Sequence, residues 1–211
     1  MQRSTVEYER KWRRDLVYAA IGFGVLALCM RAVRHGDVGT LEESAFRAIN
    51  GMPDWLRAPM WVFQIFGSLA FVVIAAVAAF ILGRQRLALA LAAAIPLKLA
   101  LEWWVVKALV ERERPFFTVS DATIRDVNTS PIGFPSGHAI FAFILVGLLA
   151  PHLGRPGKAV VWILAAANSI ARVYLGAHNP LDVVAGAALG LAIAAGINLA
   201  TGVPEADTAA G

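Results

Sequence analysis

Six apolar runs, each about as long as a bilayer-spanning helix, determine what this 211-residue sequence can fold into. A helix needs about 20 mostly apolar residues to cross the hydrocarbon core, and a helix in lipid satisfies its own backbone hydrogen bonds. The sequence therefore predicts an all-α fold: an integral membrane bundle of six transmembrane helices, forming one domain over residues 1–211. The predicted helices cover residues 16–33, 60–82, 87–110, 139–153, 159–175 and 181–201.

The composition agrees with a membrane location. Hydrophobic residues make up 58% of the chain and charged residues only 16%, whereas soluble domains carry about 25% charged residues. An ordinary soluble domain is therefore excluded. We expect membrane lipids rather than nucleic acid as partners, and a homodimer is left open. One cysteine, Cys29, leaves no possibility of an intrachain disulfide.

Basic residues in the short connections predict the orientation in the membrane. Lys and Arg are frequent in residues 1–14, 83–86 and 154–158. Because cytoplasmic loops are enriched in these residues, we expect cytoplasmic N- and C-termini and an uncleaved first helix. The alanine-rich, arginine-using composition suggests a bacterial plasma membrane. Residues 202–211 are predicted to be a short disordered tail.

The connection after the first helix contains a short amphipathic pattern. Thr40 and Glu43 have the spacing of a capping box, and Leu41, Phe46 and Ile49, together with Ala45, would share one helix face. We expect a short helix on the outer membrane surface, with a simple spacer as the alternative.

Three polar stretches fall at the same membrane face. They read "KALVERERP" at 107–115, "PSGH" at 135–138 and "ARVYLGAHNPLD" at 171–182. Lys107 and Arg114 are seven residues apart, so on a continuous helix they would share a face, and Pro115 would end that helix. This convergence of cations, histidines and a carboxylate predicts a functional site on the extracytoplasmic side.

The cations indicate an anionic substrate. Lys107, Arg114 and Arg172 together would bind a phosphate or diphosphate, to which guanidinium groups donate paired hydrogen bonds. A helix that begins at the Pro-Ser-Gly-His turn would add free backbone N–H groups. We therefore add Ser136, which would also cap this helix, and Gly137, whose missing side chain permits close approach of a substrate oxygen.

The two histidines would divide the chemistry. Asp182 follows His178 by one helical turn, and a carboxylate on the far imidazole nitrogen would orient His178 as a nucleophile. His138 would act as the general acid for the leaving oxygen. We expect a phosphohistidine intermediate and neither a metal nor a cofactor, because the cations would neutralise the phosphoryl oxygens.

These stretches resemble the three-part motif of the type 2 phosphatidic acid phosphatase family, relatives of vanadium haloperoxidases and bacterial acid phosphatases. The family pattern is Lys-x6-Arg-Pro, Pro-Ser-Gly-His and Ser-Arg-x5-His-x3-Asp, and all three spacings are intact between Lys107 and Asp182. The departure is Ala171, where the family usually has Ser. The resemblance implies a helical bundle, usually of six spanning helices, with an extracytoplasmic site and the same residue roles.

Other functions stay open at this point. His138, His178 and Asp182 could form a metal triad, although three nearby cations would repel a divalent ion. Ser136 with the same His178 and Asp182 could form an intramembrane serine hydrolase. A non-catalytic lipid-phosphate binder or transporter and a lipid phosphotransferase are further alternatives.

Among lipid phosphates, we rank an isoprenoid diphosphate such as undecaprenyl diphosphate narrowly above phosphatidylglycerol phosphate and phosphatidate. The motif leaves Lys98 and Glu102 unexplained. Both lie within the predicted third helix, where ionisable residues are rare. Lys98 would lie on the helix face opposite Lys107, so we expect a buried structural ion pair, with a helix or dimer contact as the alternative.

Overall fold

The computed structural model describes residues 7–126 and 130–205, and nearly all of its regular structure is helical. The α-helices are α1 (Trp12–Ala32), α2 (Thr40–Asn50), α3 (Arg57–Ile65), α4 (Leu69–Ile81), α5 (Gln85–Ala100), α6 (Lys107–Leu109), α7 (Pro115–Thr118), α8 (Gly137–Leu149), α9 (Arg155–Tyr174) and α10 (Pro180–Thr201). Two 3₁₀ turns, η1 (Asp54–Leu56) and η3 (Ala150–His152), a π-helical segment, η2 (Leu101–Val106), and two short strands, β1 (Tyr8–Glu9) and β2 (Val203–Pro204), complete it.

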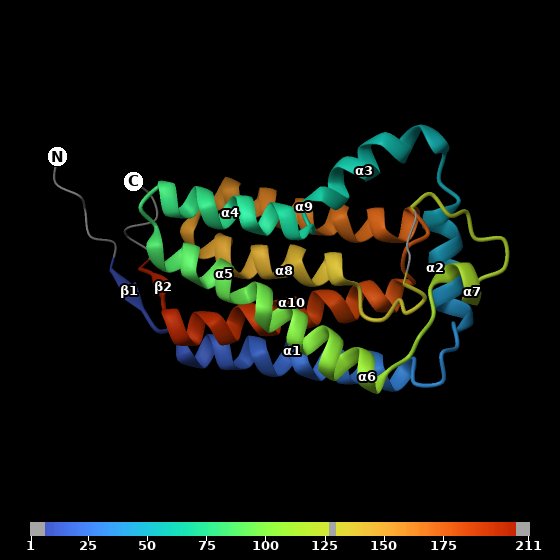
Figure 1. Cartoon of the computed structure of the whole chain (residues 1–211), viewed down its shortest axis with the longest axis horizontal. Helices are drawn as coiled ribbons and strands as arrows, with labels where there is room; N and C mark the ends of the chain where they lie inside the picture. Colours follow the sequence, from blue (N-terminus) through green and yellow to red (C-terminus); the bar gives the residue numbers. More distant parts are fainter. Residues whose placement is uncertain (1–6, 127–129, 206–211) are drawn as a thin grey trace.

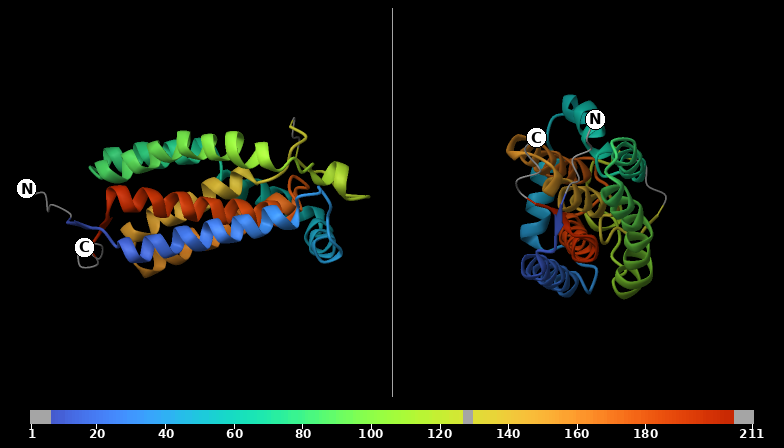
Figure 2. Two further views of the ribbon diagram at one scale, coloured as in Figure 1. Left: turned by 90° about the horizontal axis from the view of Figure 1, so that it is seen from below. Right: turned by 90° about the vertical axis from the view of Figure 1, so that its left-hand side faces the viewer.

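The long helices form an elongated bundle in which α10 packs against α1 on one side and α8 on another (Figures 1 and 2). Two glycines make the contact with α8 possible. A Cβ at Gly186 would lie 2.6 Å from the carbonyl oxygen of Ser136, and one at Gly190 would collide with the carbonyl of Ile140. The small-residue spacing of the last helix therefore fixes where α10 begins relative to the start of α8.

The membrane spans agree only in part with the six-helix prediction. Within the described residues, three helices are long and apolar enough to cross a bilayer: α1, the continuous helix Gln85–Leu109, and α10. The helix Gly137–His152 is apolar but shorter. All six predicted segments are helical, but the count of six spans is not established.

The predicted single helix over residues 60–82 is wrong. It is split into α3 and α4, which are bent by 48° at the break and together are apolar enough to form one broken span or a re-entrant loop. Ser68 caps α4 by accepting a hydrogen bond from the Phe71 amide. A side chain at Gly67 would collide with the backbone carbonyl of His138. The break thus lets the chain pack closely against the start of α8.

The two described ends of the chain meet. β1 and β2 pair antiparallel, with Tyr8 opposite Pro204, and both lie at one end of the bundle (Figure 1). The predicted disordered tail is therefore wrong for residues 202–205, and residues 206–211 lie outside the described part. Residues 1–6 of the basic N-terminal segment also lie outside it.

Helix α2 lies at the opposite end (Figure 1) and differs in detail from its prediction. Gly39 is its N-cap residue, and Thr40 is already helical and makes no capping hydrogen bond. The buried face consists of Glu42, Phe46 and Asn50, while Leu41 is 87% exposed. Polar contacts to neighbouring loops, rather than an apolar stripe alone, decide which face of α2 turns inward.

Candidate active site

The three polar stretches meet at the end of the bundle where α2 and α7 lie, away from the paired termini (Figure 1). The end of the helix Gln85–Leu109, the starts of α8 and α10 and the end of α9 all contribute to this region. The structure therefore brings together residues as far apart in the sequence as Lys107 and Asp182.

The chain from Val110 to Arg114 is extended, so the predicted helical register between Lys107 and Arg114 is wrong. The helix ends at Leu109, and Pro115 begins α7 instead of ending the longer helix. Pro115 accounts for the extended conformation of Arg114, because helical angles are disfavoured at the residue before a proline. The extended segment pairs with the loop 131–133, through Arg114 N to Pro131 O at 3.0 Å and Gly133 N to Arg112 O at 2.7 Å.

Arg114 lies directly beside His178, the candidate nucleophile. Its Nη1 donates to the carbonyl of Ala177 at 2.7 Å and is 3.3 Å from Nε2 of His178. Its Nε donates to the carbonyl of Ser130 at 2.6 Å. Burial lowers the pKa of Arg114, and the nearby Arg172 lowers it further. The guanidinium group of Arg114 is thus held next to Nε2 of His178, the residue predicted to be the nucleophile.

His178 and Asp182 lie close together, one turn apart, but without a hydrogen bond between them. Nδ1 of His178 lies 3.7 Å from Oδ2 of Asp182, and both side chains are buried. Asn179 caps α10, and Oδ2 of Asp182 accepts its backbone N–H at 2.9 Å. Burial lowers the pKa of His178 well below its usual value, and Arg172 and Arg114 lower it further. Burial and the neighbouring cations therefore favour the neutral imidazole, which is the form that can act as a nucleophile.

Arg112 is the functional candidate that the sequence reasoning missed. It is completely buried and donates from Nη1 to Oδ1 of Asp182 at 2.8 Å and to Oε1 of Glu42 at 2.9 Å. Its Nη2 donates to Oε2 of Glu42 at 2.6 Å. Burial alone would lower the pKa of Arg112, but Glu42 and Asp182 raise it above its ordinary value.

A pattern in the sequence could have revealed this contact. Residues two apart in an extended chain point to the same side, so Arg112 and Arg114 both face the start of α10, one at Asp182 and the other at His178. Glu42 also accepts the backbone N–H of Leu181 at 2.9 Å. Helix α2 is thus tied to the start of α10 through one carboxylate.

The Pro-Ser-Gly-His turn forms the start of α8. Ser136 caps the helix, accepting from the Ala139 amide at 3.5 Å, and its own N–H donates to the carbonyl of Asp182 at 2.9 Å. Gly137 is the first residue of the helix. His138 lines a cavity of about 530 Å³ together with Arg172.

That cavity combines polar and apolar walls. Helix α3 contributes Val62 and Ile65, which are largely exposed, and Gln64, which is buried. Nη1 of Arg172 donates to Oδ2 of Asp126 at 2.8 Å and to Oε1 of Gln64. The cavity is therefore lined by a guanidinium, an imidazole and apolar side chains of α3.

Lys107, Glu102 and Lys98 form one buried group, contrary to the prediction that Lys98 and Lys107 lie on opposite faces. Lys98 is ion-paired with Glu102, and Nζ of Lys107 lies 3.6 Å from Oε1 of Glu102. Lys107 also donates to the carbonyl of Phe134 at 3.3 Å. The π-helical segment η2 explains the difference, because its i→i+5 turns rotate the chain less per residue than an α-helix does.

The predicted buried ion pair of Lys98 with Glu102 is thus present, and it lies beside the site. A Cβ at Gly137 would be 3.0 Å from Nζ of Lys98 and from Oε1 of Glu102. The start of α8 therefore rests directly on this pair.

We expect Glu102→Gln to destabilise the protein more than Lys98→Met. The first change leaves two buried ammonium groups close together without a carboxylate, whereas the second leaves Glu102 beside Lys107. Thermal denaturation of the purified variants in one detergent measures the order. A larger loss of stability in Lys98→Met would contradict the placement of Glu102 between the two lysines.

The metal-triad alternative gains no support from this geometry. In residues 7–126 and 130–205, no group of three or more His, Cys, Asp and Glu side chains is arranged to hold a metal ion. Asp182 instead directs its oxygens to Arg112 and to the amide of Asn179.

The fold and the site together define an integral membrane helical protein that holds several cations and two histidines at one end of its bundle. A family model described as the PAP2 superfamily matches residues 85–202. That match covers more than half of the chain, so the chain belongs to the PAP2 superfamily.

Three curated proteins show similar sequences over part of their length. A decaprenylphosphoryl-5-phosphoribose phosphatase of Mycolicibacterium smegmatis is 37% identical over 39% of this chain and 43% of its own. An undecaprenyl-diphosphatase of Sulfolobus acidocaldarius is 36% identical over 41% and 42%. Phosphatidylglycerophosphatase B of Bacillus subtilis is 37% identical over 41% and 45%. The chain thus matches less than half the length of each of these relatives.

Two solved structures share the fold more completely. The crystal structure of Aquifex aeolicus LpxE is 25% identical, with a TM-score of 0.61 over 75% of this chain and 94% of that one. A transmembrane PAP2 type phosphatidylglycerolphosphate phosphatase from Bacillus subtilis has a TM-score of 0.69 over 86% and 94%; at 22% identity it shows the fold alone.

Proposed function

We propose that this protein is a membrane lipid phosphate phosphatase that works through a phosphohistidine on His178. One observation carries the proposal: the buried imidazole of His178 has its Nε2 3.3 Å from Nη1 of Arg114 and its Nδ1 3.7 Å from Oδ2 of Asp182. This arrangement orients an imidazole for attack and places a cation where a phosphoryl oxygen would lie. The names of the similar proteins, all phosphatases, support the same reaction class.

The reaction has two steps. In the first, Nε2 of His178 attacks phosphorus, the bond between phosphorus and the leaving oxygen breaks, and a protonated His138 gives that oxygen a proton. Burial and Arg172 lower the pKa of His138 in the free site, so this step requires that the negative charge of the bound phosphate raises that pKa again. In the second, His138 takes a proton from water, the water oxygen attacks phosphorus, and the P–N bond breaks to release phosphate. Lys107, Arg114 and Arg172, with Ser136 and the Gly137 amide, bind the phosphoryl oxygens in both steps.

A lipid substrate fits the cavity that contains His138 and Arg172. Its apolar wall on α3 suits a hydrocarbon chain, and its cationic side suits the phosphate. We rank an isoprenoid diphosphate first and phosphatidylglycerol phosphate or phosphatidate second. Transfer of the phosphoryl group to an alcohol in place of water would make the same site a phosphotransferase.

We further propose that the protein lies in a bacterial plasma membrane with cytoplasmic termini and an extracytoplasmic site. The distribution of Lys and Arg supports this orientation. The paired termini and the site lie at opposite ends of the bundle (Figure 1), as this requires. Cysteine labelling from outside intact cells at Trp55→Cys tests it, because Trp55 is exposed in η1, next to Pro53, whose carbonyl accepts from Tyr174 at the end of α9. Protection of that position would reverse the orientation.

Phosphate release from a panel of purified lipid phosphates tests the function. The panel contains an isoprenoid diphosphate, phosphatidylglycerol phosphate and phosphatidate, assayed with and without a chelator. We expect release by the wild type in both conditions. Lipid binding without phosphate release would support a non-catalytic binder, and loss of release with the chelator would support a metal site.

The low pKa of His178 predicts the acid limb of the pH profile. Because the lowered pKa keeps the imidazole neutral as the pH falls through 6.5, kcat/KM should not decline at that pH through protonation of His178. In Arg114→Gln one neighbouring cation is removed, so the pKa of His178 should rise. The decline of kcat/KM at low pH should then begin at a higher pH than in the wild type. The ionisation of the lipid phosphate is titrated separately, because it also enters the pH profile of kcat/KM. A wild-type limb at or above 6.5 that differs from the substrate's own ionisation and is unchanged in Arg114→Gln would contradict this prediction.

A further inference from the structure

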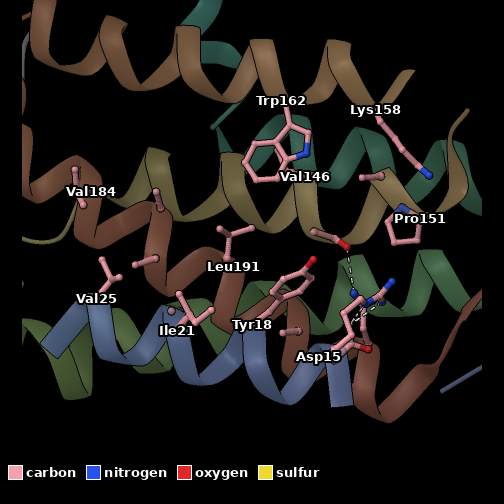
Figure 3. A pocket seen from close by; sticks show the side chains of 18 residues that line it. Asp15, Tyr18, Ile21, Val25, Val146, Pro151, Lys158, Trp162, Val184 and Leu191 are labelled. Carbon is pink, nitrogen blue, oxygen red and sulfur yellow. Dashed lines mark hydrogen bonds and ion pairs between the residues drawn. The ribbon is translucent and has the colours of Figure 1, made fainter. Parts of the chain in front are cut away.

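A membrane-facing groove lies away from the candidate active site, between α1 and α9 (Figure 3). Its volume is about 540 Å³. Tyr18 and Ile21 of α1 form one wall and Trp162 of α9 forms the other, all with exposed side chains. Because these surfaces would face hydrocarbon in a bilayer, the groove must be filled by an apolar group.

Small side chains create the groove. Its floor on α8 and α10 includes Gly147, Ala187, Ala188 and Ala195. Helix α1 sits close to this floor, because a Cβ at Gly22 would be 2.6 Å from the carbonyl oxygen of Ala188. Helix α9 packs mainly on α8 and α3 instead. The gap between α1 and α9 is therefore a consequence of the fold and of the alanine-rich face of α10.

One end of the groove is polar and carries surplus positive charge. Lys158 and Asp15 lie there, while Val25 and Val184 lie at the other end (Figure 3). Arg14 also lines this end and donates to Oδ1 of Asp15 at 2.8 and 2.9 Å. Arg14 thus neutralises Asp15, and Lys158 forms no ion pair with any residue of the described chain.

We propose that this groove binds one anionic phospholipid from the membrane leaflet opposite the candidate active site. The phosphate lies against Lys158 and Arg14, and an acyl chain follows Leu191 towards Val184. The surplus charge distinguishes this occupant from a zwitterionic lipid and from an apolar helix of a second copy. The bound lipid is not the substrate, because its headgroup lies at the end of the bundle that holds the paired termini (Figure 1).

Native mass spectrometry of the detergent-purified full chain tests the proposal, with phosphatidylglycerol and phosphatidylcholine supplied at equal mole fractions. We expect the protein to retain one phosphatidylglycerol molecule in preference to phosphatidylcholine. In Lys158→Gln, this preference should fall by about fivefold, the effect of about 1 kcal/mol per basic residue near a lipid surface. Arg155→Gln is the control, because Arg155 is exposed near the same end of α9 but does not line the groove.

A steric variant provides an independent check. Ala187→Phe fills the floor of the groove and should abolish retention of both lipids, whereas Ala78→Phe, on an exposed face of α4, should leave it unchanged. The proposal would be overturned if the wild type retained the two lipids equally. It would also be overturned if Arg155→Gln lost as much of the preference for phosphatidylglycerol as Lys158→Gln. A disulfide between two copies through Tyr18→Cys would assign the groove to a dimer instead. Phosphate release is measured separately, and Lys158→Gln should leave it unchanged.

Discussion

Replacement of His178 by Gln is expected to lower kcat by about 10³-fold or more, the order of loss that follows removal of a covalent nucleophile. Glutamine retains a polar side chain of similar length but cannot form the phosphoramidate bond. Because Arg114, Arg172 and Lys107 stay in place, binding of a lipid phosphate should persist. Phosphate release and lipid binding are measured on the same preparation.

The matched control for this change is His152→Gln, which alters a histidine in η3 at the other end of the bundle. It should retain wild-type turnover. Turnover by His178→Gln within about tenfold of the wild type would remove His178 from the role of nucleophile. Loss of lipid binding together with turnover would show that the variant had lost the site as a whole.

Arg112→Met is expected to cost about 3–5 kcal/mol of the free energy of unfolding, the range found when one partner of a buried ion pair is removed. The change leaves Glu42 and Asp182 buried without their guanidinium partner. Thermal denaturation in detergent measures the loss of stability. Arg155→Met, at an exposed position, is the control and should have little effect.

The same variant also tests the proposed link between Arg112 and catalysis. Arg112 touches Asp182 but not the substrate, so in the fraction that folds kcat should fall while KM changes little. Arg114→Met, which removes a group that binds phosphate, should raise KM as well. Arg112→Lys keeps the charge but loses the contacts of the planar guanidinium, and it should restore stability only in part. Wild-type stability and kcat in Arg112→Met would contradict the positioning role.

The sequence predicted the parts of the structure that follow from period and spacing. Apolar runs identified five helical segments and one, residues 60–82, that is broken into α3 and α4. The spacing of His178, Asn179 and Asp182 predicted a capped helix with the carboxylate one turn from the imidazole. Both depend on local geometry, which a single segment determines by itself.

What the sequence did not predict depends on departures from regular helices and on distant contacts. Because η2 is π-helical, Lys107 lies on a different face from the one that a continuous α-helix would give it. The spacing of apolar residues does not reveal a π-helical turn. The bend at Gly67 reflects close packing against His138, which only the folded chain brings near. The contact of Arg112 with Glu42 joins residues 70 positions apart, and the inward face of α2 follows from it.

Trapping of the phosphorylated protein tests the central claim most directly. The purified wild type is mixed with a lipid phosphate labelled at the phosphoryl group, denatured during turnover at alkaline pH, where phosphohistidine survives, and mapped by peptide mass spectrometry. We predict a single labelled site at His178 that is absent from His178→Gln. Label on His138 or Ser136, or turnover without any labelled peptide, would contradict the account.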